Sequence, residues 1–189
     1  SRCRPSAWPL TAAISGASIR SGDGAGLEVR SGLVIFNAEN TYTGQTKITG
    51  GVLQAQDREG IHRNSNINLA GGVLQSSGLF NRYLGTGSDR LQWTGSGGFS
   101  AVDGDLTVSL NQGQDLTWGA GNFVGTGSSL IFGSSSATGN VTFNNAIELG
   151  SGTRSIRNAA NGDNSNKVTL TGKITGTGSV VVNDGNNNG

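Results

Sequence analysis

The sequence of 189 residues contains no methionine, one cysteine and two prolines, and only 13% of its residues are charged. A single cysteine excludes an intrachain disulfide. The chain is also only 33% hydrophobic and 6% aromatic, a composition that does not suit a large globular core. Low charge and few prolines do not suit a disordered chain either. A slender core made of many short strands satisfies both constraints.

Long apolar runs and dense basic clusters are missing as well. No apolar run approaches the roughly 18 residues that a membrane span requires. Positive charge is spread thinly: residues 1–90 carry nine Lys and Arg against six Asp and Glu, 91–153 carry none against four, and 154–189 carry four against two. A nucleic-acid-binding protein usually has a clustered basic face. We therefore expect neither membrane insertion of this chain nor a nucleic-acid partner.

Glycine is abundant, with 33 residues, and it interrupts nearly every window of eight that could form a helix. Between the glycines, β-branched residues stand in short alternating runs, which predict strands joined by turns. The predicted strands are residues 27–29, 33–36, 46–48, 52–54, 67–69, 73–75, 90–93, 106–110, 115–118, 129–132, 140–143, 153–157, 167–171 and 178–183. Most are three to six residues long, as in the faces of solenoid proteins.

The first residues differ in composition from the rest. Both prolines, the cysteine and one of the three tryptophans fall within residues 1–9. We interpret 1–21 as an atypical leader or an expression-derived segment, with a cap on the first coil as an alternative. Residues 22–189 are expected to form a single β-helical repeat domain that is part of a longer chain.

A five-residue sequence, GGVLQ, occurs at residues 50–54 and again at 71–75. A looser repeat relates LQWTGSGGF at 91–99 to LTWGAGNF at 116–123. Periods of about 20 to 50 residues indicate solenoids or related arrays. The period is too short for a propeller blade, and no leucine-rich consensus is present. We predict an all-β fold, a right-handed parallel β-helix (solenoid) of about seven coils.

In such a coil, residues one period apart occupy the same slot of successive layers. Val52 is therefore predicted to lie beneath Val73, and Leu53 beneath Leu74.

Residues 40–54, NTYTGQTKITGGVLQ, resemble the autotransporter-associated β-strand repeat, whose pattern is approximately N-T-Y-T-G-x-T-x-I-x-x-G-x-L. Residues 24–27 and 176–180 are similar to the glycine-rich lead-in of that repeat. The resemblance implies a passenger segment of an exported bacterial surface protein, folded as a parallel β-helix and located extracellularly or on the bacterial outer surface. Passenger segments of this kind include adhesins, and the repeat itself brings no catalytic residues.

We therefore expect a structural or adhesive module that presents polar faces and loops on a rigid β-helix. The expected partner is a glycan or another host or cell-surface ligand. Unpaired strand edges at the two ends of the coil also predict head-to-tail self-association.

A carbohydrate-active hydrolase or lyase is the first enzymatic alternative. Asp103 and Asp105 have the i, i+2 spacing that places two carboxylates on one face of a strand, and β-helical polysaccharide hydrolases use paired aspartates. The Gly-His-Gly and Arg-x-Lys elements of galacturonase-like families are absent, however, and Asp-Gly is typical of turns. We expect a turn here.

An esterase-like hydrolase with a serine nucleophile is the second enzymatic alternative. His62 is the only histidine and would have to act as its base. No G-x-S-x-G sequence is present, and the charged residues beside His62 indicate a solvated loop.

Calcium is the one cofactor that the sequence leaves open, and no other is expected. Aspartate and asparagine oxygens are the ligands that calcium prefers. The two candidate sets are Asp103, Asp105 and Asp115, and Asp163 with Asn161 and Asn164. Neither set matches a calcium-binding nonapeptide or an EF-hand loop, and both residue types are common in turns.

Four aromatic and two basic residues are further candidates for ligand binding. Trp93 and Trp118, with the neighbouring Phe99 and Phe123, would form a sugar-stacking platform if exposed on one face, whereas their solenoid spacing favours packing in the core. Arg154 and Arg157 are three apart in a predicted strand, so they should point to opposite faces and not cooperate as in a β-helical lyase.

Overall fold

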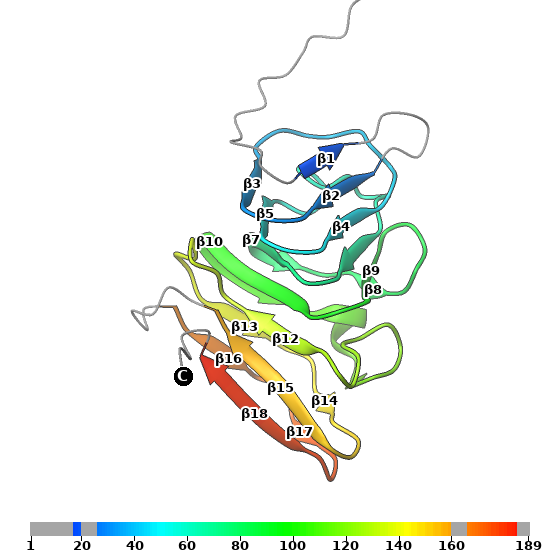
Figure 1. Ribbon diagram of the computed structural model, residues 1–189, viewed down its shortest axis with the longest axis vertical. Helices are drawn as coiled ribbons and strands as arrows, with labels where there is room; N and C mark the ends of the chain where they lie inside the picture. The colour runs from blue at the N-terminus through cyan, green and yellow to red at the C-terminus, as the bar shows by residue number, and fades with distance from the viewer. Residues whose placement is uncertain (1–16, 20–25, 160–165, 185–189) are drawn as a thin grey trace, which may run out of the picture.

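The chain folds into a stack of short strands wound about one long axis (Figure 1). This computed structural model describes residues 17–19, 26–159 and 166–184. Within these ranges the only helical element is η1, a short 3-10 segment at Leu110–Gly113. No helix of the described residues is long and apolar enough to cross a membrane. Most of the segment 1–21, and the candidate ligands at 161–164, lie outside the described residues.

The strands of the described residues follow in chain order. They are β1 (Ala17–Ile19), β2 (Leu27–Val29), β3 (Leu33–Phe36), β4 (Thr46–Ile48), β5 (Val52–Ala55), β6 (Ile67–Leu69), β7 (Val73–Phe80), β8 (Tyr83–Leu84), β9 (Arg90–Trp93), β10 (Gly97–Val108), β11 (Leu116–Thr117), β12 (Ser129–Phe132), β13 (Val141–Phe143), β14 (Ile147–Glu148), β15 (Thr153–Asn158), β16 (Val168–Leu170), β17 (Ile174–Thr175) and β18 (Ser179–Asp184).

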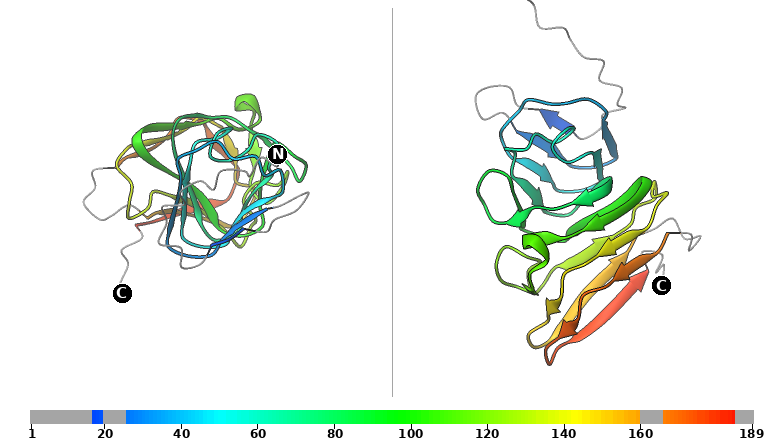
Figure 2. Two further views of the ribbon diagram at one scale, coloured as in Figure 1. Left: turned by 90° about the horizontal axis from the view of Figure 1, so that it is seen from above. Right: turned by 180° about the vertical axis from the view of Figure 1, so that it is seen from behind.

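In the described part of the chain these strands form three sheets. The first has the order β1-β2-β4-β6-β9-β8, the second β3-β5-β7-β10-β12-β15-β18 with β13 and β16 attached beside β10, and the third β11-β14-β17. Their pairings are parallel except that of β1 with β2. Seen from above, the strands surround a common centre (Figure 2). The fold is thus all-β with parallel sheets, consistent with the predicted β-helix.

The GGVLQ repeat sets the register of two neighbouring strands. Val52 pairs with Val73, Leu53 with Leu74 and Gln54 with Gln75 in the parallel β5–β7 ladder. Leu53 and Leu74 are fully buried, so both fill the interior of the stack. The predicted superposition of these residues is confirmed. The same residues recur in the sequence because each layer places the same side chain at the same position of the core.

The glycine pair that opens the repeat is required where the chain turns tightly against the layer before it. Gly71 has φ +148°, and a Cβ at this position would collide with the carbonyl oxygen of Thr49. A Cβ on Gly72 would lie only 2.5 Å from a methyl group of Ile48. Any larger residue would therefore push the two layers apart.

The interior of the stack changes from aliphatic to aromatic along its axis. Phe123 lies between Trp93 and Trp118, with ring centroids 5.2 Å and 5.7 Å away, and Phe99 lies 6.0 Å from Trp93. All four rings are buried, the most exposed being Trp93 at 6%. These aromatic residues are therefore core, as their spacing favours, and none offers an exposed ring face to a sugar.

The looser repeat would imply that Trp93 and Trp118 occupy equivalent positions of one ladder. The structure shows that they do not. Trp93 ends β9, which pairs with β6 and β8, whereas Trp118 follows β11, which pairs with β14. The loop that carries Phe123 fills the space between them. Two similar sequence segments 25 residues apart thus belong to different sheets.

Residues 40–46, which begin with NTYTG, form hydrogen bonds with the loop between β5 and β6 in the next layer. Asn40 donates from Nδ2 to the carbonyl oxygen of Gly60 at 2.9 Å. The hydroxyl groups of Tyr42 and Thr46 lie 2.8 Å apart, and Thr46 Oγ1 lies 2.8 Å from Ser65 Oγ. Burial raises the pKa of Tyr42 to about 12. These polar residues therefore act inside the fold rather than at its surface.

Arg82 is buried at 1% exposure, a position that the sequence does not suggest because arginine is usually exposed. Its guanidinium donates from Nε to Asp57 Oδ1 at 2.9 Å and from Nη1 to the backbone oxygen of Ser65. A buried cation of this kind is tolerated when a paired carboxylate and further acceptors surround it. The pair joins the loops that follow β5 and β7.

Predicted strands at 27–29, 33–36, 46–48, 67–69, 90–93 and 129–132 are confirmed at those bounds. β7 and β10 are much longer than predicted, because both continue through glycines: Gly78 lies within β7, and Gly97 and Gly104 within β10. The two-residue strands β8, β14 and β17 were not predicted. Two residues are too few to show a period, and pairing with a neighbouring layer makes them strands.

Candidate functional site

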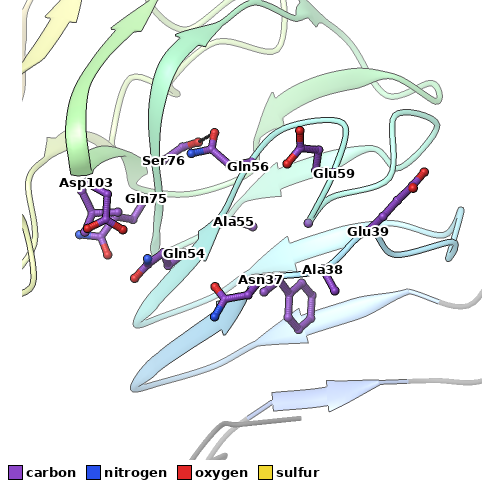
Figure 3. A pocket seen from close by; sticks show the side chains of 13 residues that line it. Asn37, Ala38, Glu39, Gln54, Ala55, Gln56, Glu59, Gln75, Ser76 and Asp103 are labelled. Carbon is purple, nitrogen blue, oxygen red and sulfur yellow. Dashed lines mark hydrogen bonds between the residues drawn. The ribbon is translucent and has the colours of Figure 1, made fainter. Parts of the chain in front are cut away.

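A surface groove of about 430 Å³ crosses the ends of β3 and β5 and the middle of β7 (Figure 3). Its walls are residues 36–39, 54–56, 59–60, 75–76 and 102–103. These segments come from four layers of the stack, so the parallel pairing brings them together. The volume lies within the range of about 300–1,000 Å³ that is usual for small-molecule sites. We take this groove as the candidate functional site.

One wall of the groove is an irregularity in β10. Ala101 pairs with Ser76, and Leu106 pairs with Gly78. Between these two pairs the chain advances five residues in β10 but only two residues in β7. Asp103 lies in the bulged segment with φ +57°, a left-handed conformation that is uncommon for residues other than glycine. Bulges often redirect a side chain beside a functional site. Here the bulge brings Asp103 to the groove.

Gln75 is on the buried side of the groove and its amide is fully used. It donates from Nε2 to Ser100 Oγ at 3.1 Å and to Ser134 Oγ at 2.9 Å, and its Oε1 accepts from Ser136 Oγ at 3.1 Å. Gln75 and Ser100 are fully buried. This cluster of one amide and three hydroxyls holds the floor of the groove rigidly.

Gln54 lies directly opposite Gln75 in the β5–β7 ladder, yet its environment is different. It is half-buried, lines the groove, and its amide forms no hydrogen bond with the described residues. The exposed Asn37 also lines the groove, and its amide likewise forms no hydrogen bond with the described residues. The groove therefore contains amide groups that can both donate and accept hydrogen bonds.

The charge of the groove has one sign. Glu39, Glu59 and Asp103 line it, and no lysine or arginine does. In Figure 3 Asp103 lies towards one end and the two glutamates towards the other, with Gln54 and Asn37 between them. Their carboxylates accept no hydrogen bond from the described residues. Such a groove disfavours anions and favours ligands rich in hydrogen-bond donors.

The paired-aspartate hypothesis is not supported by the position of the second carboxylate. Asp105 Oδ1 accepts hydrogen bonds from the backbone N–H and from Nδ2 of Asn140, at 2.8 Å and 3.0 Å. Asp103 lines the groove, whereas Asp105 does not. The bulge separates their roles, because it breaks the i, i+2 alternation that would place both on one face. The segment is a bulge inside a strand rather than the turn we expected.

His62 lies in the loop between β5 and β6 and is half-buried. Its Nδ1 accepts a hydrogen bond from the backbone N–H of Asn64 at 3.2 Å, and its carbonyl oxygen accepts from Ser65 at 2.9 Å. No serine hydroxyl is hydrogen-bonded to its ring within the described residues. His62 does not line the groove. Its observed contacts shape the loop.

Calcium candidates are dispersed in the part of the chain that the structure describes. No group of three or more His, Cys, Asp or Glu residues gathers there as metal ligands. Asp115 is exposed and does not line the groove with Asp103, and Asp105 is bonded to Asn140. Asp163 lies outside the described residues. The proposed calcium ligands thus remain a prediction from sequence.

Arg154 and Arg157 point to opposite faces of β15, as predicted from their spacing. Arg154 is 7% exposed and donates from Nε to the carbonyl oxygen of Leu149 at 2.8 Å, while Arg157 is exposed. Neither lines the groove. Arg154 stabilises the turn before its own strand.

Comparison with known proteins finds one similarity that bears on function. A stretch of 132 residues, 69% of this chain, is 31% identical to the adhesin BmaC autotransporter of Brucella suis biovar 1 (strain 1330). The matched stretch covers 4% of that adhesin. No family model matches the chain, so the specific repeat family stays a prediction. No solved structure matches it. This chain is therefore similar to part of an autotransporter adhesin, and it spans a small part of that protein's length.

Proposed function

We propose that this chain is an adhesive, passenger-type module of an exported bacterial surface protein, located on the outer surface or outside the cell. The observation that carries the proposal is the 31% identity with an autotransporter adhesin over 132 residues. The finer architecture that we propose is a right-handed β-helix of about seven coils.

The proposed mechanism is geometric. Backbone groups bond from layer to layer, as from Leu53 in β5 to Leu74 in β7 and on to Phe99 in β10, and these buried side chains fill the axis. A solenoid built in this way is rigid, and each layer adds loops and polar side chains to its outside. Such a rod holds its ligand-binding surface in a fixed position away from its point of attachment.

Bead adhesion tests the proposal. Fluorescent beads coated with the purified chain are washed over epithelial cell layers and over dishes coated with cell-surface glycans. We expect more retained beads than with Leu53→Asp, a variant that places a carboxylate in a fully buried position and should not fold. Equal retention of the two kinds of beads on every surface would refute an adhesive role.

A further inference from the structure

We propose that the groove over β3, β5 and β7 binds an oligosaccharide that carries no negative charge. The inference rests on the proposed function, because it names the ligand class and the residues through which adhesion would act. It is argued from three features of the groove: unused hydrogen-bonding groups, charge, and a small apolar surface.

The hydrogen-bonding groups are unevenly used. At equivalent positions of two layers, Gln75 is saturated by three serine hydroxyls, whereas Gln54 has an unused amide directed to the groove. The half-buried Gln54 amide has no partner among the described residues, so both its oxygen and its N–H groups are available to a ligand in the groove. A ligand that supplies both donors and acceptors would satisfy it, and a sugar hydroxyl supplies both.

The charge of the groove selects among polar ligands. Carboxylates of Glu39, Glu59 and Asp103 only accept hydrogen bonds when ionised, so they require O–H or N–H donors. Phosphate, sulfate and carboxylate groups of a ligand would be repelled by them, with no basic side chain in the lining to compensate. Neutral hexoses and amino sugars supply these donors without a negative charge, whereas uronic and sialic acids add a carboxylate that the groove would repel.

Apolar atoms are also available between the polar groups. Phe36, Ala38, Ala55 and Val102 contribute to the lining, and Phe36 is only partly buried by the core. Sugar rings carry C–H faces beside their hydroxyls, so they match a mixed lining better than an ion or a fully polar peptide does. With acidic groups towards both ends and amides between them, the groove suits an extended ligand (Figure 3).

The bulge of β10 brings the Asp103 carboxylate to the groove. Asp103 adopts φ +57° while its carboxylate forms no hydrogen bond with the described residues. Its backbone N–H donates to Thr138 Oγ1 at 3.1 Å, which holds the bulge in place.

Fluorescence polarisation with labelled hexasaccharides tests the inference. The probes are maltohexaose and cellohexaose, which are neutral, a glucosamine hexasaccharide, which carries amines, and a galacturonic acid hexasaccharide, which is anionic. We expect saturable binding of a neutral or amino-bearing probe and weaker or no binding of the anionic probe. No binding of any neutral or amino-bearing probe, or preferred binding of the anionic one, would overturn the proposal.

Variants locate the site. Gln54→Ala and Asp103→Asn should each raise the Kd of the bound probe at least about fivefold, the effect of losing one to two hydrogen bonds. Asparagine tolerates a positive φ, so the second change preserves the bulge. Gln114→Ala and Asp115→Asn are the matched controls, since both residues are exposed and outside the groove. Equal affinities in groove and control variants would place binding elsewhere and overturn the assignment.

The same variants separate this inference from the adhesive function on which it rests. Retained beads that are unaffected by Gln54→Ala and by Asp103→Asn would leave the adhesive function in place and refute the groove. Hexasaccharide binding that Gln54→Ala abolishes, without any bead retention by the unmodified chain, would support the groove and refute adhesion.

Discussion

Gln54 and Gln75 are direct partners in the parallel β5–β7 ladder, yet Gln75 is saturated by Ser100, Ser134 and Ser136 while Gln54 forms no hydrogen bond with the described residues. Both end a copy of the same five-residue repeat. One copy therefore serves the interior of the fold, and the other leaves its amide at the groove surface.

Replacing these two glutamines should have opposite consequences. Gln75→Leu removes three hydrogen bonds to buried or half-buried serine hydroxyls, which keep only one another as side-chain partners, so we expect it to lower the free energy of unfolding by about 1–3 kcal/mol. Gln54→Leu breaks no hydrogen bond and should change stability by less than about 0.5 kcal/mol. Urea denaturation followed by circular dichroism measures both. Similar losses for the two variants would contradict the difference in their environments.

The register between β5 and β7 could be predicted because it depends on a short sequence that is repeated in both layers. Glycines at 50–51 and 71–72 begin equal segments, and the buried residues that follow recur at the same spacing. The groove was not predictable, since the saturation of Gln75 depends on Ser134, 59 residues further along the chain. The place of Asp103 depends likewise on a register shift between β7 and β10. Such features arise only when distant layers meet.

The buried Arg82 was missed for a related reason. No residue next to Arg82 in the sequence indicates an ion-pair partner, because its partner Asp57 lies 25 residues away. We expect Arg82→Met to destabilise the fold by about 3–5 kcal/mol, because it leaves the Asp57 carboxylate, 10% exposed, with only the exposed Arg58 at 3.7 Å as a counter-charge. The loss should appear as a lower urea midpoint.

A double variant distinguishes a lost ion pair from lost packing at this site. Asp57→Asn removes the carboxylate that loses its buried partner in Arg82→Met, so the double variant should be more stable than Arg82→Met alone. Arg63→Met, at an exposed position of the neighbouring loop, is the control and should change little. A double variant no more stable than Arg82→Met would assign the effect to packing.

Tyr42 should make stability depend on alkaline pH. Burial raises its pKa from 10.0 to about 12, so the folded protein retains the phenol proton that the unfolded chain releases. Stability should be unaffected by this group below pH 10 and should fall by up to about 1.4 kcal/mol per pH unit between pH 10 and 12.

Absorbance titration of Tyr83→Phe isolates Tyr42, because the sequence contains two tyrosines. We expect tyrosinate to form with a midpoint near 12. Urea denaturation of Tyr42→Phe between pH 9 and 12 is the companion measurement, and this variant should lose the alkaline slope. A midpoint near 10 in the folded protein would show that the phenol is exposed to solvent.

We also propose head-to-tail association through the open edge of β18. Within the described residues β18 pairs only with β15, and its Val181 and Val182 are 44% and 68% exposed. At the opposite end of the second sheet, β3 pairs with β5 alone among the strands that the structure describes, and Leu33 is 39% exposed. Unpaired parallel edges with apolar side chains are templates for another copy.

Sedimentation velocity over a hundredfold range of protein concentration should therefore show association that increases with concentration. Lysine on an edge strand opposes such pairing, so Val181→Lys with Val182→Lys should shift the protein towards monomer. Leu79→Lys is the matched control, because Leu79 is 66% exposed on β7, away from both ends of the second sheet. If the edge variant and the control associate equally, β18 is not the contact. A monomer at every concentration would exclude association altogether.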